Sequence, residues 1–480
     1  MAKNLKAKLL SASEIDLMKD QISRLLAKKG IRIHHPEVEK YLKEAGCVFE
    51  DDAVKFPEAV QEKYLAMAPR EFVLAAPDPK YDIPFPHPEG NCYGRVNTGA
   101  CRYLDVDGNF SNISLGQAEE IIRLTNDLEH IDFWSILSTD PVGFPAETID
   151  VHTYEVTLAN TKKHGWLQPY EAYNAGYMIR MAQAVMGGPD KLRERPIVSL
   201  ICCSVPTLTY KFMDLQIILD GALNGVPLQP CSLPVAGANA PVTPSGLAVI
   251  TSAEVYAQIL IAQMIAPGTP CVATPLPFDM DMRTTYTIQS SISNSMARMM
   301  SMQLFSEGYG LPAHTYGTGS DSVMLDGQNF AERMQVTLLV ALGGADVLGG
   351  AGQFETAKAI SPLLLIIDND IFGMAKKLRA GYEVTDATVG MDTILSLGEK
   401  DSFITSDHTM DYFREAYASD LFIHTSAQDR ENADTPDILY KARKVYDKLI
   451  AKEPPALVDD AVKAEVAKIV AEADAALAKK

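Results

Sequence analysis

Polar and aromatic side chains gather after three apolar runs in the second half of the chain. The runs are PLPFDMDMRTTY (275–286), PAHTYGTGSDS (312–322) and GAGQFET (350–356). If the runs are parallel strands, their carboxyl ends meet around one pocket. Aromatic faces beside a few carboxylates suit a quaternary ammonium ion, which donates no hydrogen bond and is held by cation–π attraction. The pattern predicts a small-molecule site whose candidates are Phe278, Asp279, Asp281, Arg283, His314, Tyr316, Asp321 and Phe354.

The glycines at 349–352 raise a second possibility, a loop that cradles a phosphate. The GxGxxG spacing fails, because no glycine stands at the third position after Gly350 and Gly352. Glycines at a strand end more simply allow the backbone to approach a neighbour or a ligand closely.

Each candidate also has a purely structural interpretation. His314 could be a hydrogen-bonded histidine inside the barrel. Asp279, Asp281 and Asp321 could cap the helices that follow the strands. Single aromatic residues are more often core than ligand contacts, so the functional interpretation depends on convergence from three strand ends.

Seven short apolar runs alternate with helix-length segments from about residue 133 onward. Such alternation predicts parallel strands joined by crossover helices. A doubly wound open sheet and a closed eight-stranded barrel both fit, and the number of similar units favours an α/β TIM (β/α)8 barrel. The runs are WSILSTDP, GWLQPY, PIVSLICCSVP, PLQPCSLPVAG, PCVATPLPFD, PAHTYGTGSD and ADVLGGAGQF.

The segments around the barrel are predicted from their own signals. Ser11 with Glu14 indicates a capping box, residues 36–45 a second helix, residues 51–52 a hairpin turn, and residues 113–128 an amphipathic helix. We expect a helical and small-sheet extension at 1–130, the barrel at 131–395 and helices at 396–480. Within the last segment, SDHTMDYFREAY reads as a packing helix and residues 436–480 as a frayed tail.

Composition narrows the function. A formal charge of -19 on 480 residues, with no basic cluster, argues against a nucleic-acid partner and favours cationic small molecules. No signal-length or membrane-length apolar run is expected. The seven cysteines, including adjacent Cys202 and Cys203, are typical of reduced thiols in a cytoplasmic protein, and no tight His/Cys spacing predicts zinc or another metal site.

Three long segments together resemble a known family. They are residues 34–79 (HHPEVEKYLKEAGC onward), 236–271 (AGANAPVTPSGLAV onward) and 321–355 (DSVMLDGQNFAERM onward). In this order they are similar to the trimethylamine:corrinoid methyltransferases, in particular to members without pyrrolysine. The resemblance covers nearly the whole chain.

This resemblance implies a TIM-barrel enzyme that moves a methyl group from a methylated amine to the cobalt of a separate corrinoid protein. The partner, not this chain, would carry the corrinoid cofactor. In trimethylamine enzymes a pyrrolysine follows a Gly-Tyr-Leu-Glu context late in the barrel. The matching residues here are Gly352, Gln353, Phe354 and Glu355, with Thr356 at the special position. The departure shifts the expected substrate to a quaternary amine such as glycine betaine, proline betaine or carnitine.

The resemblance also orders the candidate roles. Phe354, Tyr316 and Phe278 are expected to surround the ammonium, with Gln353 and Glu355 as the catalytic pair at the pocket wall. A substrate carboxylate needs a donor, for which His314, Arg283 and Arg102 are candidates. A tertiary methylamine methyltransferase and a betaine-binding barrel without transfer activity remain the alternatives, and a homo-oligomer is expected.

Overall fold

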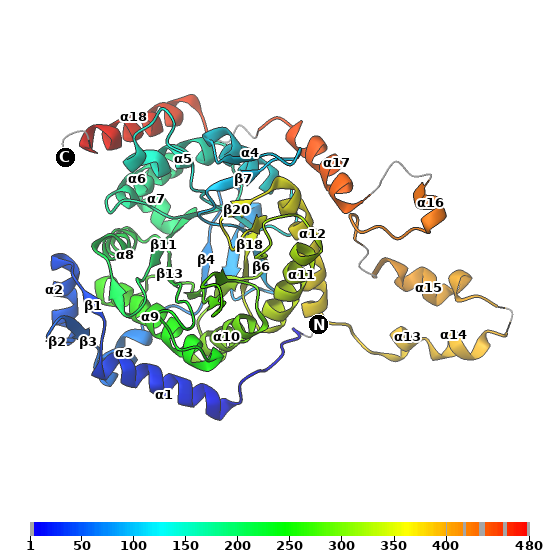
Figure 1. The fold of residues 1–480 in the computed structure, drawn as a ribbon, viewed down its shortest axis with the longest axis horizontal. Helices are drawn as coiled ribbons and strands as arrows, with labels where there is room; N and C mark the ends of the chain where they lie inside the picture. The colour runs from blue at the N-terminus through cyan, green and yellow to red at the C-terminus, as the bar shows by residue number, and fades with distance from the viewer. Residues whose placement is uncertain (1–3, 400, 416–418, 432–436, 455–457, 478–480) are drawn as a thin grey trace.

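The computed structural model describes residues 4–399, 401–415, 419–431, 437–454 and 458–477. Its centre is an eight-stranded parallel barrel (Figure 1). The ends of the sheet, β14 and β17, are joined by hydrogen bonds from the Ala273 amide to the Pro312 carbonyl (2.9 Å) and from the His314 amide to the Ala273 carbonyl (2.8 Å). In chain order the strands are β6 (Tyr93–Val96), β9 (Phe133–Ser135), β10 (His164–Leu167), β11 (Val198–Cys203), β13 (Leu228–Ser232), β14 (Thr274–Pro275), β17 (His314–Tyr316) and β18 (Val347–Ala351).

Helices on the outside follow each strand and cover the barrel. They confirm the alternation expected from the sequence, and all seven predicted runs contain a barrel strand. The main covering helices are α4 (Leu115–Thr125), α5 (Ile149–Leu158), α6 (Asn174–Met186), α8 (Phe212–Asn224), α9 (Pro244–Ile265), α10 (Ile292–Gln303), α11 (Gly327–Leu342) and α12 (Pro362–Ala380), with the short α7 (Pro189–Glu194) after α6.

The first barrel strand lies before the predicted boundary at residue 131. Strand β6 is only four residues long and contains Gly94 and Arg95, so it lacks the apolar run by which the other strands are recognised. The barrel therefore begins within the segment that was expected to be an extension.

The N-terminal extension covers one side and one end of the barrel. It comprises α1 (Ala12–Lys28), β1 (Arg32–Ile33), α2 (Pro36–Ala45), β2 (Val48–Glu50), β3 (Ala53–Lys55), α3 (Glu58–Leu65), β4 (Phe72–Leu74) and β5 (Ile83–Phe85). The capping box of α1 and the β2–β3 hairpin are confirmed. The β4–β5 hairpin packs Leu74, Ile83 and Phe85 against the barrel interior, at the end where strand β6 begins.

Helix α9 is apolar on all sides because it is covered on all sides. Helices α1, α2 and α3 pack on it from outside, while β13 and β14 lie inside. It is the one helix among the described residues that is long and apolar enough to cross a membrane, with a mean hydropathy of 1.4, and 94% of that window is buried inside the protein.

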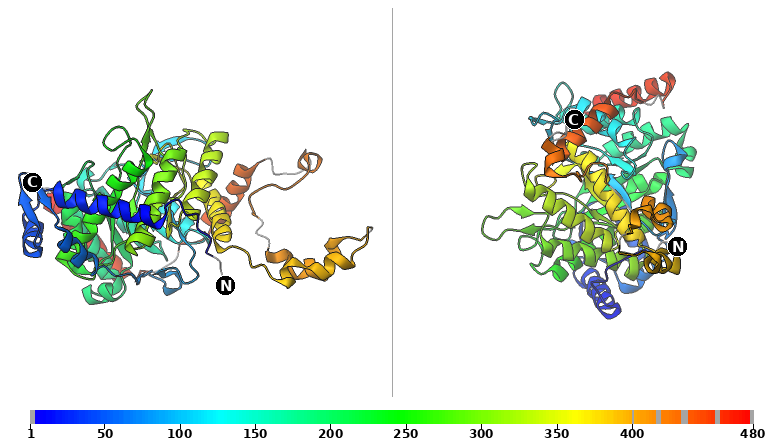
Figure 2. Two further views of the ribbon diagram at one scale, coloured as in Figure 1. Left: turned by 90° about the horizontal axis from the view of Figure 1, so that it is seen from below. Right: turned by 90° about the vertical axis from the view of Figure 1, so that its right-hand side faces the viewer.

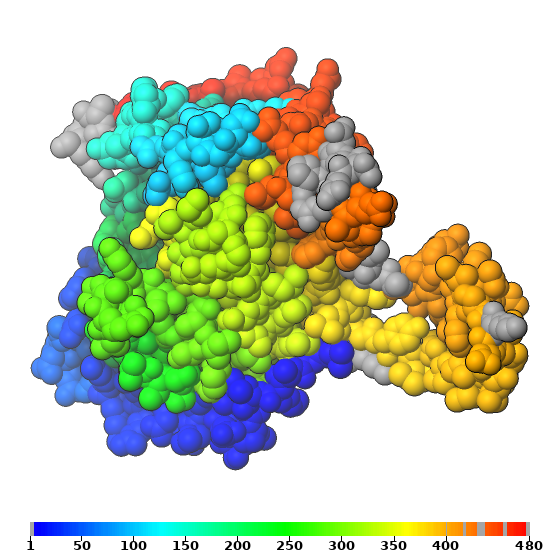
Figure 3. Space-filling model, turned by 45° about the vertical axis from the view of Figure 1, so that its right-hand side comes forward, coloured from blue at the N-terminus to red at the C-terminus, as the bar shows by residue number. Residues whose placement is uncertain are grey.

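After α12 the chain forms an arm that stands away from the barrel (Figures 2 and 3). Its helices α13 (Asp386–Val389), α14 (Met391–Ser396) and α15 (Asp407–Tyr412) bury no residue. The chain continues through α16 (Ala427–Glu431) and returns with α17 (Ile438–Ile450), which packs against α12 and α4.

Helix α18 (Asp460–Leu477) corrects the expectation of a frayed tail. It packs against α5 and α6 and buries Val466, Ile469, Val470 and Ala473. The last three residues of the predicted tail lie outside the described part of the chain.

Four further short pairs complete the fold. Strands β7 (Arg102–Leu104) and β8 (Phe110–Asn112) join β19 (Gln353–Phe354) and β20 (Ala359–Ile360) in a four-stranded sheet. This sheet follows β6 and β18, so it lies at the carboxyl ends of two neighbouring barrel strands. The hairpin β15 (Asp279–Met280) and β16 (Thr287–Ile288) follows β14, and β12 (Thr209–Tyr210) pairs with β1.

Candidate active site

Two aromatic rings meet inside the barrel near the carboxyl ends of its strands. The ring centroids of Phe278 and Tyr316 lie 6.0 Å apart at 64°, an edge-to-face pair. Their exposed fractions are 7% and 5%, so both rings are buried, in the cluster that fills the barrel interior. The hydroxyl of Tyr316 has no hydrogen-bond partner among the described residues, and burial raises the pKa of this hydroxyl to about 12. The pair offers aromatic faces in a dry environment.

His314 lies two residues before Tyr316 and therefore points to the same side of β17. Its ring is 4.8 Å from that of Trp166, and its Nε2 accepts a hydrogen bond from Nε of Arg95 at 3.2 Å. Burial and the charges of Arg95 and Arg298 lower the pKa of His314 well below its usual value, so the imidazole is neutral. Because Nε2 is the acceptor, the proton is on Nδ1, which has no partner in the described structure.

The glycine-rich turn makes room for these side chains. A Cβ on Gly349 would overlap Nε2 of His314, and a Cβ on Gly350 would overlap the amide of Gln353. Gly350 and Gly352 also have φ angles of 96° and 86°, which favour glycine. The turn thus serves close packing of side chains at the strand end, in agreement with the simpler of the two sequence interpretations.

Two arginines that sequence reasoning missed are buried beside the aromatic pair. Arg95, on β6, is 1% exposed and its Cζ lies 4.5 Å from the centre of the Trp166 ring. Arg298, on α10, is fully buried, and its Cζ lies 5.7 Å from the centre of the Tyr316 ring. Burial lowers the pKa of each to about 10, so both are charged at neutral pH. In the part of the chain that the structure describes, neither forms an ion pair with a carboxylate.

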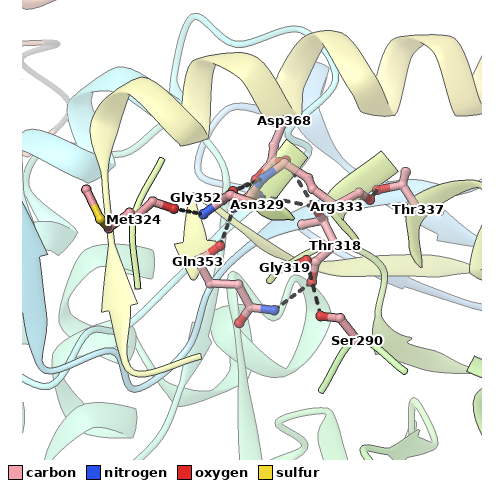
Figure 4. Close-up of polar contacts among 10 residues, drawn as sticks. All are labelled: Ser290, Thr318, Gly319, Met324, Asn329, Arg333, Thr337, Gly352, Gln353 and Asp368. Atoms are coloured by element: carbon pink, nitrogen blue, oxygen red, sulfur yellow. Dashed lines mark hydrogen bonds and ion pairs between the residues drawn. The ribbon is translucent and has the colours of Figure 1, made fainter. Parts of the chain in front are cut away.

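Gln353 is held by a buried polar network that joins two strand ends (Figure 4). Its side-chain amide donates to the backbone carbonyl of Thr318 at 2.7 Å, and its backbone carbonyl accepts a hydrogen bond from Arg333. Arg333 forms an ion pair with Asp368 in which both side chains are 0% exposed. Asp368 also accepts from the Gly352 amide at 2.6 Å and from Thr318 Oγ1 at 3.0 Å. The side-chain oxygen of Gln353 has no partner among the described residues.

The next three residues form a strained turn. Glu355, Thr356 and Ala357 have φ angles of 52°, 53° and 68°, in the left-handed region that costs non-glycine residues about 1–2 kcal/mol each. The side chains hold the turn in place: Nη1 of Arg102 lies 2.6 Å from a carboxylate oxygen of Glu355, and Thr356 Oγ1 donates to Asp321 at 2.9 Å. Such strain persists where surrounding contacts determine the backbone, and it is frequent at functional sites.

The other acidic candidates support loops. Both carboxylate oxygens of Asp321 accept backbone amides, those of Gln289 and Ser290, at 2.8 and 2.9 Å. Asp279 accepts from Ser291, the residue that caps α10. The capping alternative is nevertheless wrong, because Ser291 caps α10 and Asp326 caps α11.

Two expected site residues lie elsewhere. The ring of Phe354 is fully buried in a separate cluster with Leu104, Ala359 and Leu364, because it points to the opposite side of β19 from Gln353. Phe354 therefore does not join Phe278 and Tyr316 in a three-ring cluster, as the sequence had suggested. Arg283 pairs with Asp281 on the β15–β16 hairpin, and its side chain is 89% exposed.

The described residues contain no group of three or more His, Cys, Asp and Glu side chains that could hold a metal ion. All seven cysteines are free thiols.

Comparison with known proteins gives a consistent picture. The family model for trimethylamine methyltransferase (MTTB) matches residues 2–478. Trimethylamine methyltransferase MttB of Methanosarcina barkeri is 30% identical over 417 residues, covering 84% of this chain and 82% of the relative. Glycine betaine methyltransferase of Desulfitobacterium hafniense is 23% identical over 468 residues, 97% of each chain.

Among solved structures, the monomethylamine methyltransferase MtmB of Methanosarcina barkeri is similar in fold. Its TM-score is 0.51 at 13% identity, and the match covers 95% of this chain and 92% of that one. The barrel and its additions are thus shared with a methylamine enzyme.

Proposed function

The chain belongs to the trimethylamine methyltransferase (MTTB) family, and on that premise we propose that it transfers a methyl group from a quaternary amine to the Co(I) of a separate corrinoid protein. The observation that carries the proposal is the buried pair Phe278–Tyr316, which faces no free carboxylate. Asp279, Asp321 and Glu355 are each bound to other groups of the protein. An ammonium is thus offered aromatic faces without a strong ion pair.

This arrangement suits the transfer of a methyl group from a positively charged nitrogen to a nucleophile. The electron pair of Co(I) forms the Co–C bond, while the electrons of the C–N bond stay on nitrogen, which departs as a neutral tertiary amine. Positive charge disperses in the transition state, so a carboxylate against the nitrogen would stabilise the substrate more than the transition state. Aromatic faces bind the cation without stabilising the substrate so strongly over the transition state, and a dry site orients one methyl group.

The residue after Glu355 favours a quaternary over a tertiary amine. When a tertiary amine is the substrate, removal of its methyl group would release an amide anion, unless the nitrogen is first protonated or captured by an electrophile. Thr356 is no electrophile, and its hydroxyl is bound to Asp321. A quaternary amine needs neither aid, which agrees with the relative that is named a glycine betaine methyltransferase.

We assign Gln353 and Glu355 positioning roles in this reaction. The fixed amide of Gln353 keeps the β17 and β18 ends together at the site. Glu355, through Arg102, ties the β19–β20 hairpin to β7. Neither residue has to exchange a proton with the substrate.

The rate of methyl transfer from the amine to cobalt is expected to be independent of pH between about pH 7 and pH 9. His314 stays neutral there because its pKa lies well below the usual value, whereas Arg95 and Arg298, with pKa values of about 10, stay charged. Tyr316 stays protonated because its pKa is about 12. Stopped-flow rates of methyl-Co(III) formation at saturating amine measure this; a bell-shaped profile inside that range would instead indicate a proton-coupled step.

The proposal is tested by mixing the purified chain with a reduced corrinoid protein, or with free cob(I)alamin, without oxygen. Each amine is added in turn and the cobalt spectrum is followed. Conversion to methyl-Co(III) with a betaine, and none with trimethylamine, supports the proposal. Conversion with trimethylamine alone favours a tertiary amine substrate. Binding of a betaine without conversion by an active corrinoid protein favours a binding protein.

The corrinoid protein must approach the mouth of the barrel, and exposed apolar side chains there support such docking. Val142 follows β9, Met282 and Tyr286 belong to the hairpin after β14, and Met324 follows β17. Their exposed fractions are 77%, 64%, 76% and 64%. We propose that these residues contact the partner.

A homo-oligomer is proposed from the arm at 381–437. Helix α12 returns from the mouth to the opposite end of the barrel, where Arg379 binds the carbonyl of Ala345 just before β18. The arm therefore starts far from the mouth, and it exposes Leu395 and Ile404 at 76% and 74%. Light scattering is expected to show an oligomer that Leu395→Asp with Ile404→Asp dissociates, while Val142→Asp leaves the mass unchanged. A monomeric wild type would contradict this.

A further inference from the structure

Arg298 is a buried charge that forms no ion pair among the described residues; the carboxylates of Asp321 and Asp279 raise its pKa, but both are bound to other groups. Of its guanidinium nitrogens, Nη2 donates to the Pro277 carbonyl at 3.3 Å, whereas Nε and Nη1 have no partner among the described residues. A guanidinium taken out of water costs several kcal/mol unless it is paired and fully hydrogen-bonded. Arg333, a buried arginine on the neighbouring helix α11, shows the usual solution, because Asp368 neutralises it.

The unpaired charge is not isolated. Arg95 also lacks a carboxylate partner and instead donates to His314, to the Val96 carbonyl and to Ser135. Both arginines lower the pKa of His314 and of Tyr316. The interior next to the aromatic pair therefore carries two positive charges that form no ion pair among the described residues, although the protein as a whole has a formal charge of -19.

Further polar atoms without a partner lie on the Arg298 side of the site. Asn294, one helical turn before Arg298 on α10, has a free side-chain oxygen, and its amide donates to the Gln289 carbonyl. Both polar side-chain atoms of Gln289 are buried without a partner, and so is Nδ1 of His314. Buried polar groups are nearly always hydrogen-bonded in proteins, so a cluster of exceptions indicates a bound polar group.

We infer that Arg298 binds a carboxylate of the substrate, so that the substrate is a zwitterion with its ammonium on Phe278 and Tyr316. The inference rests on the proposed function and narrows its substrate class to amino-acid betaines and similar carboxylated quaternary amines. It also replaces the three donors expected from the sequence. Arg102 is paired with Glu355 and Arg283 is exposed, while His314, being neutral, offers one N–H donor but no charge.

The geometry separates the two ends of such a substrate. Arg298 lies behind the rings: its Cζ is 5.7 Å from the Tyr316 ring centre, and its one bound nitrogen contacts the residue before Phe278. A carboxylate there neutralises the guanidinium and accepts from the free nitrogens. The ammonium of the same molecule remains on the side of the rings that is close to solvent, where a methyl group can face the corrinoid. A simple cation such as choline would instead meet uncompensated positive charge.

The test is calorimetric binding of glycine betaine, proline betaine, carnitine and choline to the wild type, Arg298→Gln, Arg298→Lys and Arg283→Gln. The wild type is expected to bind at least one carboxylated amine about 10-fold or more tightly than choline. Arg298→Gln should lower that affinity by about 10- to 100-fold and leave choline binding unchanged or improved, since hydrogen bonds to charged groups are the strong ones. Arg298→Lys should retain part of the affinity, and Arg283→Gln should match the wild type.

Folding of the variants is checked by thermal denaturation. Removing an unpaired buried charge is expected to leave the melting temperature unchanged or higher, so a loss of betaine binding at an undiminished melting temperature separates ligand binding from structural support. If Arg298→Gln does not fold, the wild-type preference for carboxylated amines over choline decides.

Four outcomes overturn the inference or separate it from the proposed reaction. Equal binding of betaines and choline by the wild type, or undiminished betaine binding by Arg298→Gln, overturns it. Methyl transfer from choline as fast as from every betaine overturns it too, while the proposed reaction stands. Betaine binding that depends on Arg298 without any methyl transfer supports the carboxylate site and contradicts the reaction.

Discussion

Tyr316→Ala is expected to lower kcat/KM for methyl transfer by about 100- to 1,000-fold. The change removes one of the two rings of the Phe278–Tyr316 pair. A desolvated cation–π contact contributes about 2 kcal/mol, and the vacated space lets the ammonium move away from the attack geometry. The rate of methyl-Co(III) formation with a betaine over a range of concentrations measures the effect.

Tyr316→Phe is the matched control for this prediction. No hydrogen bond involves the hydroxyl of Tyr316 among the described residues, so its removal is expected to change kcat/KM by less than about 5-fold. If Tyr316→Phe were as damaging as Tyr316→Ala, the hydroxyl and not the ring would be the important group. If Tyr316→Ala retained wild-type activity, the aromatic site would be wrong.

The largest expected effect on stability comes from Asp368→Ala. Asp368 neutralises Arg333 and accepts from the Gly352 amide and Thr318, and all of these contacts are buried. Breaking a buried ion pair from one side leaves an uncompensated charge and costs about 3–5 kcal/mol. Urea unfolding followed by the fluorescence of Trp134 and Trp166, both within the barrel, measures the loss.

Two controls separate the ion pair from a general effect of substitution. The double variant Asp368→Leu with Arg333→Met removes both charges and is expected to be more stable than Asp368→Ala. Asp281→Ala, in the exposed pair with Arg283, should leave the urea midpoint unchanged. A midpoint for Asp368→Ala equal to the wild type would show that the network of Figure 4 does not support the strand ends.

Much of the barrel could be predicted from the sequence because most of its strands are buried on both faces. Such strands appear as continuous apolar runs separated by helix-length segments. Strand β6 was missed because Gly94 and Arg95 interrupt any apolar pattern. In the arm, the helix expected in SDHTMDYFREAY is present as α15, but the expectation that it packs was wrong, because the arm helices are short and bury no residue.

The candidate site was only partly predictable. The sequence shows which residues stand at the ends of consecutive strands. Phe278 and Tyr316 are two of these residues, and the structure brings them together. The direction of Phe354 depends on the hairpin that begins after Gly352, which no local pattern specifies. Arg95 and Arg298 were missed because a buried arginine without an acidic partner is visible only once the tertiary packing is known.

The left-handed turn at 355–357 also lies beyond sequence reasoning. Glu355, Thr356 and Ala357 carry none of the glycine or asparagine that usually marks such backbone. Their conformation is imposed from outside, by Arg102 and Asp321.

The central claim is best tested by following an isotopic methyl group from the amine to cobalt. Glycine betaine, proline betaine and carnitine with deuterated N-methyl groups, together with deuterated trimethylamine, are incubated separately with the chain and a Co(I) corrinoid protein, and both products are analysed by mass spectrometry. The account predicts that one betaine gives deuterated methyl-Co(III) and its singly demethylated tertiary amine in equal amounts, and that trimethylamine gives neither. Label on cobalt from trimethylamine alone, or from none of the four amines with an active corrinoid partner, would contradict it.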